Sequence, residues 1–241
     1  KIGWAEIIQT LTKKYQTEAV NVWREYFQHL FLLYFYKQPE AGNIYFKGGT
    51  ALRLIYQSPR FSDDLDFSSS VKDINKIERA AINALADIER EGIDTELIEA
   101  TETTGGYLAT MQFGNNGDRI ATRIEISLRN GKKEKGELVT IASDFIPPYT
   151  LVQLAQEQIV EGKIAALLSR QKPRDFYDFY FLLRANMIRA KSKELLQGTL
   201  DALQASHIRF DYELKRFLPQ SHWPMIRNFK EALEREIRKY L

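Results

Sequence analysis

The segment 119–129 alternates cleanly between two kinds of side chain, and this alternation constrains the fold more than any other feature. Successive residues of a strand point to opposite faces, so such a segment has one core face and one polar face. The core face would carry Ile120, Thr122, Ile124, Ile126 and Leu128, and the polar face Arg119, Arg123, Glu125, Ser127 and Arg129. The chain therefore contains a half-buried sheet.

Other segments extend this sheet. Strands are predicted at 94–99 and 106–113, because Gly105-Gly106 and the run 115–118 are typical of hairpin turns. A short strand at 43–46 runs into Gly48-Gly49 and then a helical segment at 50–56, which indicates strand, tight turn and helix. Another strand is predicted at 65–68.

Helical spacing dominates both ends of the chain. Apolar residues recur every three or four positions over 4–36, which predicts two opening helices, and over 72–91. The segment 145–150 contains two prolines and is the best linker candidate. Beyond it only helices are predicted, at 151–170, 174–185, 193–206, 212–217 and 223–241. The expected class is α+β, with one domain at 1–146 and a helical domain at 147–241.

Composition excludes several kinds of protein. The chain has no cysteine, so disulfides, thiolate metal sites and a cysteine nucleophile are excluded. The formal charge of +2 is too small to indicate a nucleic-acid binder by itself. The most apolar stretch, 27–36, is shorter than the roughly 20 residues that span a bilayer. We expect a core helix there, no membrane partner and a cytoplasmic location. His29, His207 and His222 lack the spacing of a zinc site or a catalytic triad.

Asp64 and Asp66 are the strongest metal candidates. They are two residues apart on a predicted strand, so their carboxylates project from the same side. Two such carboxylates repel one another unless they share a cation, and Mg²⁺ prefers hard oxygen ligands. Glu125, on the polar face of the neighbouring strand, would supply a third ligand. The alternatives are a solvated acidic turn at 63–66 and an ion pair of Glu125 with Arg123 or Arg129.

Two other sets of residues have possible roles. Gly48 and Gly49 lie where a strand meets a helix, so free backbone N–H groups there could face a phosphate; alternatively the turn is structural, with Thr50 as helix N-cap. In the helical half, Asp175 and Asp178 share one helix face, and Arg174 and Asp178 are four apart. Those charges would form either part of a site or an ordinary exposed ion pair.

Three strings together resemble one family: Phe46-Lys-Gly-Gly-Thr-Ala-Leu, then Arg60-x-Ser62-x-Asp-Leu-Asp66-Phe, then Lys163 with Arg174-Asp-Phe-Tyr-Asp178. They look like the AbiEii/AbiGii nucleotidyltransferase toxin family of the DNA polymerase β-like superfamily, over about residues 44–183. The resemblance implies a polymerase β-like core with a mixed sheet, N-terminal helices and a helical C-terminal half. It also implies a toxin of a type IV toxin–antitoxin or abortive-infection system, with a possible cognate antitoxin.

The resemblance implies transfer of NMP from an NTP, with Mg²⁺ or Mn²⁺, most often to the 3′ end of tRNA. Asp64 and Asp66 would bind metal, and Lys163 would contact phosphates. Asp175 or Asp178 would be catalytic or orient the substrate. The nucleotide-binding residues would be Lys47, Gly48, Gly49, Thr50, Arg60, Ser62 and Arg174. Among them, Arg60 and Ser62 would stabilise the loop that carries Asp64 and Asp66.

An RNA acceptor needs a positive approach to the site. The available basic residues are Lys132, Lys133, Lys135, Arg170, Lys172, Arg184, Arg189, Lys191 and Lys193, which could equally be a solvated surface. A small acceptor such as an aminoglycoside, a protein hydroxyl group, and a non-catalytic antitoxin-binding module are the alternative functions.

Overall fold

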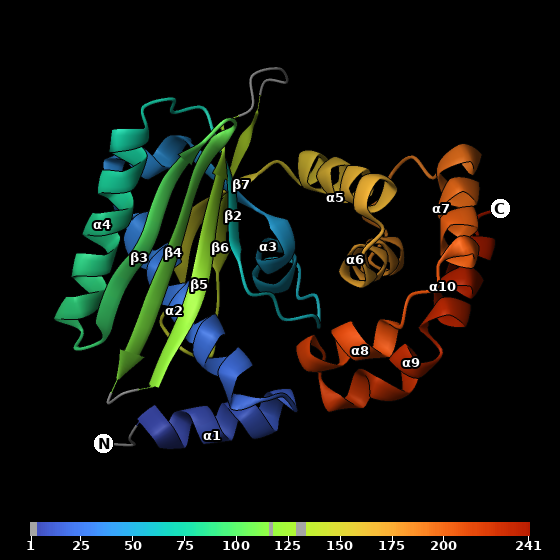
Figure 1. Ribbon diagram of the computed structural model, residues 1–241, viewed down its shortest axis with the longest axis horizontal. Helices are drawn as coiled ribbons and strands as arrows, with labels where there is room; N and C mark the ends of the chain where they lie inside the picture. The colour runs from blue at the N-terminus through green and yellow to red at the C-terminus, as the bar shows by residue number, and fades with distance from the viewer. Residues whose placement is uncertain (1–3, 116–117, 129–133) are drawn as a thin grey trace.

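The computed structural model describes residues 4–115, 118–128 and 134–241. This part of the chain forms a seven-stranded sheet in the order β3-β4-β5-β2-β1-β7-β6 (Figure 1). The strands are β1 (Ile44–Lys47), β2 (Leu65–Ser69), β3 (Asp94–Thr103), β4 (Gly106–Asn115), β5 (Asp118–Ser127), β6 (Gly136–Ile141) and β7 (Tyr149–Leu154). β1 pairs antiparallel with β2 and parallel with β7, and β2 pairs parallel with β5. The predicted α+β class with a mixed sheet is confirmed.

Two long helices, α2 (Ala19–Phe35) and α4 (Ile74–Arg90), pack against the apolar face of this sheet (Figure 1). Ile124 and Ile126 point into the resulting core, as the alternation predicts, whereas Arg123 and Glu125 are exposed on the opposite face. Most of the segment 27–36 is buried in the same core, which confirms the core-helix prediction. The polar face of β5 is thus left available for a site.

The prediction of a helix from 151 onward is wrong for its first residues. Residues 149–154 form β7, which hydrogen-bonds to β6 on one side and to β1 on the other. β6 itself was not predicted. Leu151 and Leu154 are three apart, which suits a helix, but pairing with strands distant in sequence decides the conformation. The sheet therefore continues past residue 146, and the division into domains at 146/147 stays a prediction.

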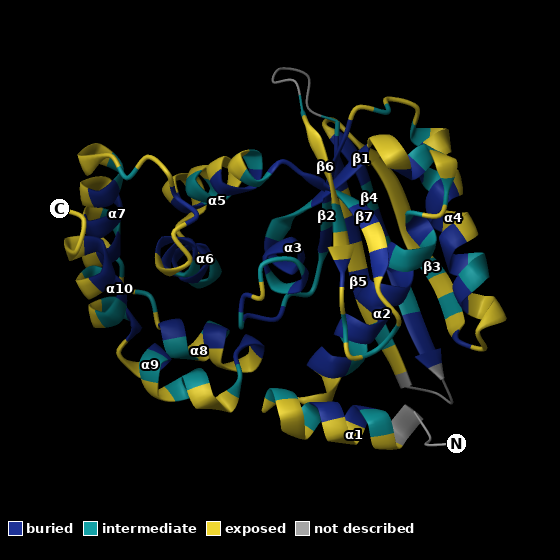
Figure 2. Cartoon of the chain, turned by 180° about the vertical axis from the view of Figure 1, so that it is seen from behind, coloured by how far each residue is buried: buried dark blue, intermediate teal, exposed yellow. Residues whose placement is uncertain are grey.

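The remaining helices lie on the other side of α3 (Gly48–Leu54) from the sheet (Figure 1). They share a second core, to which the first part of the chain contributes Tyr45 and Leu52. α6 is almost wholly buried there (Figure 2). The helices of this half are α5 (Gln156–Arg170), α6 (Pro173–Arg184), α7 (Lys193–Ala205), α8 (Phe210–Leu214), α9 (Trp223–Arg227) and α10 (Phe229–Arg238), and α1 (Trp4–Tyr15) opens the chain.

Candidate active site

Strand register brings three charged residues side by side on the polar face of the sheet. Lys47 of β1 is paired with Asp66 of β2, and Asp66 is paired with Glu125 of β5. Residues paired in register share a face, so these side chains are neighbours. Asp64 directly precedes β2, next to the position paired with Ile124. Asp66 therefore lies beside Glu125, and Asp66 acts on Asp64 as a neighbouring charge.

The two aspartates are held where their negative charge is disfavoured. Burial raises the pKa of Asp66, Lys163 opposes this, and Glu125 adds to it. Burial also raises the pKa of Asp64, and Asp66 contributes further. A divalent cation between the carboxylates would offset both the burial and the mutual repulsion. The hard oxygen donors present here fit Mg²⁺ or Mn²⁺.

The described residues contain no group of three or more His, Cys, Asp or Glu side chains already arranged to hold a metal ion. Glu125 is exposed and acts on Asp66 as a neighbouring charge. Its role as third ligand stays a prediction, as do the ligand roles of Asp64 and Asp66.

Two arginines also face the aspartates. Arg123 lowers the pKa of Asp64, and Arg174 lowers the pKa of both aspartates. Within the described part of the chain neither guanidinium makes a hydrogen bond or a close ion pair, so both are available to a ligand. Arg123 was missed as a site residue, although it lies two positions from Glu125 on the same polar face of the predicted strand.

Gly48 and Gly49 make room for the residues around them. Gly48 has φ +89°, and a Cβ there would lie 2.0 Å from Oδ2 of Asp66. A Cβ on Gly49 would lie 2.6 Å from Nη2 of Arg60 and 2.8 Å from Oγ of Ser62. Both glycines are therefore needed for close approach of the chain over residues 60–66. Their contact with a triphosphate stays a prediction.

Thr50 supports the same loop. α3 begins at Gly48, with Lys47 preceding it as the N-cap residue, so the alternative interpretation of Thr50 as N-cap is wrong. Thr50 is buried, and its hydroxyl donates a hydrogen bond to the backbone oxygen of Asp64. This contact fixes Asp64 relative to the Gly-Gly turn, and the nucleotide contact predicted for Thr50 stays a prediction.

Asp178 of α6 is the centre of a buried charge cluster. Arg60 donates to it through Nε (2.8 Å) and Nη2 (3.0 Å), and Lys163 of α5 donates to its Oδ2 (2.7 Å). Burial would raise the pKa of Asp178, but Arg60 and Lys163 outweigh this and lower it to about 2. The alternative interpretation as an exposed ion pair with Arg174 is wrong, since Asp178 is 1% exposed and binds Arg60 and Lys163 instead.

Asp175 orients a second cation. Its carboxylate is buried and accepts a hydrogen bond from Nη2 of Arg170 (2.6 Å) and from the backbone N–H of Lys172 (3.1 Å). The second contact caps the start of α6. The two aspartates of this helix thus each hold one basic side chain of α5, Lys163 or Arg170.

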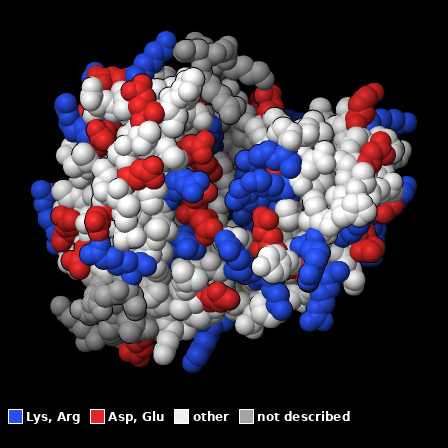
Figure 3. Space-filling model, in the orientation of Figure 1, with Lys and Arg blue, Asp and Glu red and all other residues white. Residues whose placement is uncertain are grey.

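These cations and the carboxylates of the sheet line one cavity. Its volume is about 220 Å³, and its walls are Lys47, Gly48, Asp66, Glu125, Ser127, Gln158, Ile159, Gly162, Lys163, Ala166 and Arg170. Figure 3 shows a hollow on this face, with acidic side chains gathered on the side of the sheet and basic side chains on the side of α5 and α6. Several predicted site residues are not among the residues that line it: Arg60, Ser62, Asp64, Arg174, Asp175 and Asp178.

The other predicted basic residues are dispersed. Arg184 lines a different cavity together with Tyr177 and Tyr180, and Arg189 is ion-paired with Glu157. Lys132 and Lys133 lie outside the described residues. Among the described basic residues that were predicted to guide an RNA acceptor to the site, Arg170 therefore lines the site cavity.

His29 has no part in the site. It is buried in α2, and its Nδ1 lies 2.9 Å from the hydroxyl of Tyr149. Burial lowers its pKa to about 3, so the ring is neutral. No helix in the part of the chain that the structure describes is long and apolar enough to cross a membrane.

Comparisons with known proteins concern the family and the fold of the chain. The family model described as "Nucleotidyl transferase AbiEii toxin, Type IV TA system" matches residues 30–239. The fold is similar to that of JHP933 from Helicobacter pylori, with a TM-score of 0.57 and 20% identity over 92% of this chain and 95% of that one. A structure described as a candidate nucleotidyltransferase from H. pylori has a TM-score of 0.55 and 19% identity over 91% and 97%. No curated protein sequence matches this chain.

Proposed function

We propose that this chain, which belongs to the AbiEii nucleotidyltransferase toxin family of type IV toxin–antitoxin systems, transfers NMP from an NTP to the 3′ end of tRNA with a divalent cation. Nucleotidyl transfer and a cognate antitoxin follow from the family. The NTP, the cation, Mg²⁺ or Mn²⁺, and the RNA acceptor are our proposal.

One observation carries it: a single cavity has two carboxylates and Lys47 on the wall formed by the sheet, and two further cations on the wall formed by α5. Asp66 and Glu125 come from the sheet, and Lys163 and Arg170 come from α5. A triphosphate carries several negative charges, so it needs cationic side chains at one end and a bridged cation at the other. This division of charge suits an NTP better than a neutral substrate.

The basic residues have separable roles. Lys163 would bind the phosphates, and Asp178 holds its ammonium group in place together with Arg60. Arg170, held by Asp175, would neutralise the departing pyrophosphate. Asp178 would not act as the general base, because its pKa of about 2 and its three charged hydrogen bonds keep it ionised and engaged.

Asp64 and Asp66 would hold the cations, with Glu125 beside them. Bound there, divalent cations would stabilise the attacking and leaving oxygens of an in-line displacement at the α-phosphorus. The carboxylates contribute by their fixed orientation: Thr50 fixes the backbone at Asp64, and the register with Lys47 fixes Asp66. Positioning and charge neutralisation account for the catalysis we propose.

The charges around Asp64 support the choice of acceptor. Arg123 and Arg174 face this residue, and neither is bonded within the described residues, so a phosphate backbone could bind them. A polycationic acceptor such as an aminoglycoside would be repelled by the same guanidinium groups. The terminal hydroxyl of an RNA is therefore the acceptor that we propose.

The test is incubation of the protein with each α-³²P-labelled NTP, Mg²⁺ and total cellular RNA, followed by gel separation. An Asp64→Ala/Asp66→Ala variant, checked for folding by circular dichroism, serves as the control. Label in a tRNA-sized band with the unaltered protein alone supports the proposal and identifies the nucleotide. Label on protein or on a small molecule would show that the acceptor is not RNA. Absence of both label and metal-dependent NTP binding would indicate a non-catalytic module.

A further inference from the structure

A stripe of buried polar residues follows one face of α2, a helix that otherwise lies in the core. Asn21, Glu25 and Gln28 are 4%, 6% and 2% exposed, and they recur at helical spacing. Burying polar groups is costly unless each has a partner. The partners of this stripe therefore indicate why the polar residues are there.

Two residues of this helix hold the segment 58–64, which links α3 to β2 and carries Asp64. Gln28 donates from Nε2 to the backbone oxygen of Ser62 (2.9 Å). Arg24, beside the stripe, forms an ion pair with Asp63 (2.8 Å). This segment also contains Arg60, so α2 supports both the loop that carries Asp64 and the residue that binds Asp178.

Glu25 acts on the same segment through Arg53 of α3. Arg53 donates from Nε to Oε2 of Glu25 (2.7 Å) and from Nη1 to the backbone oxygens of Ser58 and Pro59 (3.2 Å each). Its guanidinium also lies 3.7 Å from the centre of the Phe61 ring. Arg53 therefore connects Glu25 of α2 to Ser58 and Pro59, the two residues directly before Arg60.

Stability alone is a weak reason for this arrangement. Burial raises the pKa of Glu25, and Arg53 opposes this rise only in part, so the carboxylate carries a net desolvation cost. A buried ion pair contributes little net stability relative to apolar packing, whereas it can fix one geometry. The geometry fixed here is that of Arg60, which donates two hydrogen bonds to Asp178, which in turn accepts one from Lys163.

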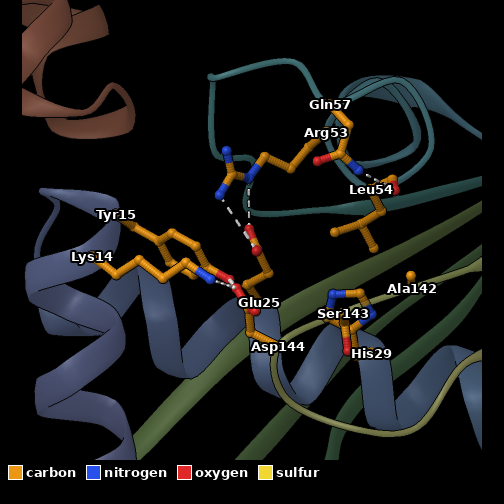
Figure 4. Close-up of a pocket in the computed structure, with 10 residues that line it drawn as sticks. All are labelled: Lys14, Tyr15, Glu25, His29, Arg53, Leu54, Gln57, Ala142, Ser143 and Asp144. Atoms are coloured by element: carbon orange, nitrogen blue, oxygen red, sulfur yellow. Dashed lines mark hydrogen bonds and ion pairs between the residues drawn. The ribbon is translucent and has the colours of Figure 1, made fainter.

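We propose that Glu25 and Arg53 are positioning residues of the transferase site, which hold the segment 58–64 so that Arg60 and Asp178 aim Lys163 into the cavity. The role of Lys163 in this inference rests on the proposed function. Glu25 and Arg53 themselves line a separate cavity of about 590 Å³, whose walls also include Lys14, Tyr15, His29 and Asp144 (Figure 4). A small cation can therefore reach the place of the guanidinium group.

This access allows a rescue experiment on Arg53→Ala. We expect kcat for labelling of the acceptor to fall about 10- to 100-fold, the range found when a residue that supports a catalytic group is removed. Free guanidinium chloride at tens of millimolar should restore part of the activity, whereas equal NaCl should not. Arg119→Ala removes an arginine from an exposed ion pair with Glu96 and serves as the matched control, with no loss and no rescue.

A second measurement does not depend on activity. Acetic anhydride modifies free amines, and mass spectrometry of the peptide containing Lys163 gives its rate of modification. Lys163 is largely buried and bound to Asp178, so its modification should be slow in the unaltered protein and in Arg119→Ala. The rate should rise several-fold in Arg53→Ala and fall again with guanidinium.

An unchanged modification rate of Lys163 in folded Arg53→Ala would overturn the inference, as would a loss of activity that guanidinium does not restore. If Arg53→Ala does not fold, Glu25→Gln keeps the shape of that side chain while removing its charge. Arg53 is still present in that variant, so guanidinium rescue does not apply, and an unchanged kcat or an unchanged modification rate of Lys163 would overturn the inference. If the unaltered protein transfers no nucleotide, the proposed function fails, and the modification rate of Lys163 still decides the positioning role.

Discussion

Asp178→Asn is the most direct test of the buried charge cluster, because asparagine keeps the shape of the side chain and removes its charge. Arg60 is 4% exposed, and the side chain of Lys163 is 13% exposed. The substitution therefore leaves two largely buried cations without their counter-charge. Removing one partner of a buried ion pair costs about 3–5 kcal/mol. We expect a loss of that size in the free energy of unfolding at pH 7.

Part of that loss should depend on pH. The pKa of Asp178 falls from its ordinary 3.8 to about 2 in the folded protein. A carboxyl group with a lowered pKa stabilises the fold above its unfolded pKa, and this contribution is lost as pH falls through the folded pKa. The shift corresponds to about 2 to 3 kcal/mol at neutral pH, of which about 1 kcal/mol is lost by pH 3. The difference in the free energy of unfolding between the unaltered protein and Asp178→Asn should therefore become smaller as the pH falls.

Urea unfolding at pH 7, 5 and 3 measures this difference, and other titrating groups cancel because both proteins contain them. Asp201→Asn, on the exposed face of α7, is the matched control and should change stability by no more than about 0.5 kcal/mol at any pH. A cost below about 1 kcal/mol for Asp178→Asn, or a difference that stays constant from pH 7 to pH 3, would refute the reasoning.

Three other changes test the site. Asp66→Asn should leave the metal-free protein as stable as the unaltered protein or slightly more stable, since the pKa of Asp66 is raised. It should also abolish nucleotide transfer. Thermal unfolding with and without Mg²⁺ measures the stability, and the labelling assay measures the transfer. Gly48→Ala should lower the free energy of unfolding by more than about 1 kcal/mol and displace Asp66, because Gly48 has a positive φ and a Cβ there would lie 2.0 Å from Asp66. Gly198 of α7 has open space around it, so Gly198→Ala should be neutral or stabilising. Urea unfolding midpoints measure both changes. Arg170→Gln should raise KM for the NTP, and Asp175→Asn should reproduce part of that change; equal KM values would exclude a phosphate contact by Arg170.

Local patterns were sufficient for much of the sheet. The alternation along 119–129 correctly predicted that Ile124 and Ile126 are core and that Glu125 is not. The succession of strand, Gly48-Gly49 turn and helix over 43–56 was also predicted, because strand period and glycine conformation depend on neighbouring residues only. The resemblance of the same strings to the AbiEii family is confirmed by the match over 30–239.

Such local patterns could not predict how segments distant along the chain pack together. β7 is a strand because β1 and β6 pair with it, although its apolar spacing also suits a helix. Asp178 resembled half of a surface ion pair with Arg174, yet it is buried against Arg60, 118 residues away. The polar stripe of α2 had no interpretation in the sequence, since its partners include Arg53, Ser62 and Arg216, which are distant along the chain.

The sequence by itself therefore determined the chemistry of each segment: which residues carry charge, which strand face is polar and where glycine permits close approach. The tertiary structure alone decided which charges meet. Packing α5 and α6 beside the sheet places Lys163 and Arg170 across a cavity from Asp66, and it buries the carboxylates that hold both cations. Such contacts depend on how whole elements pack, and no local period of the chain encodes them.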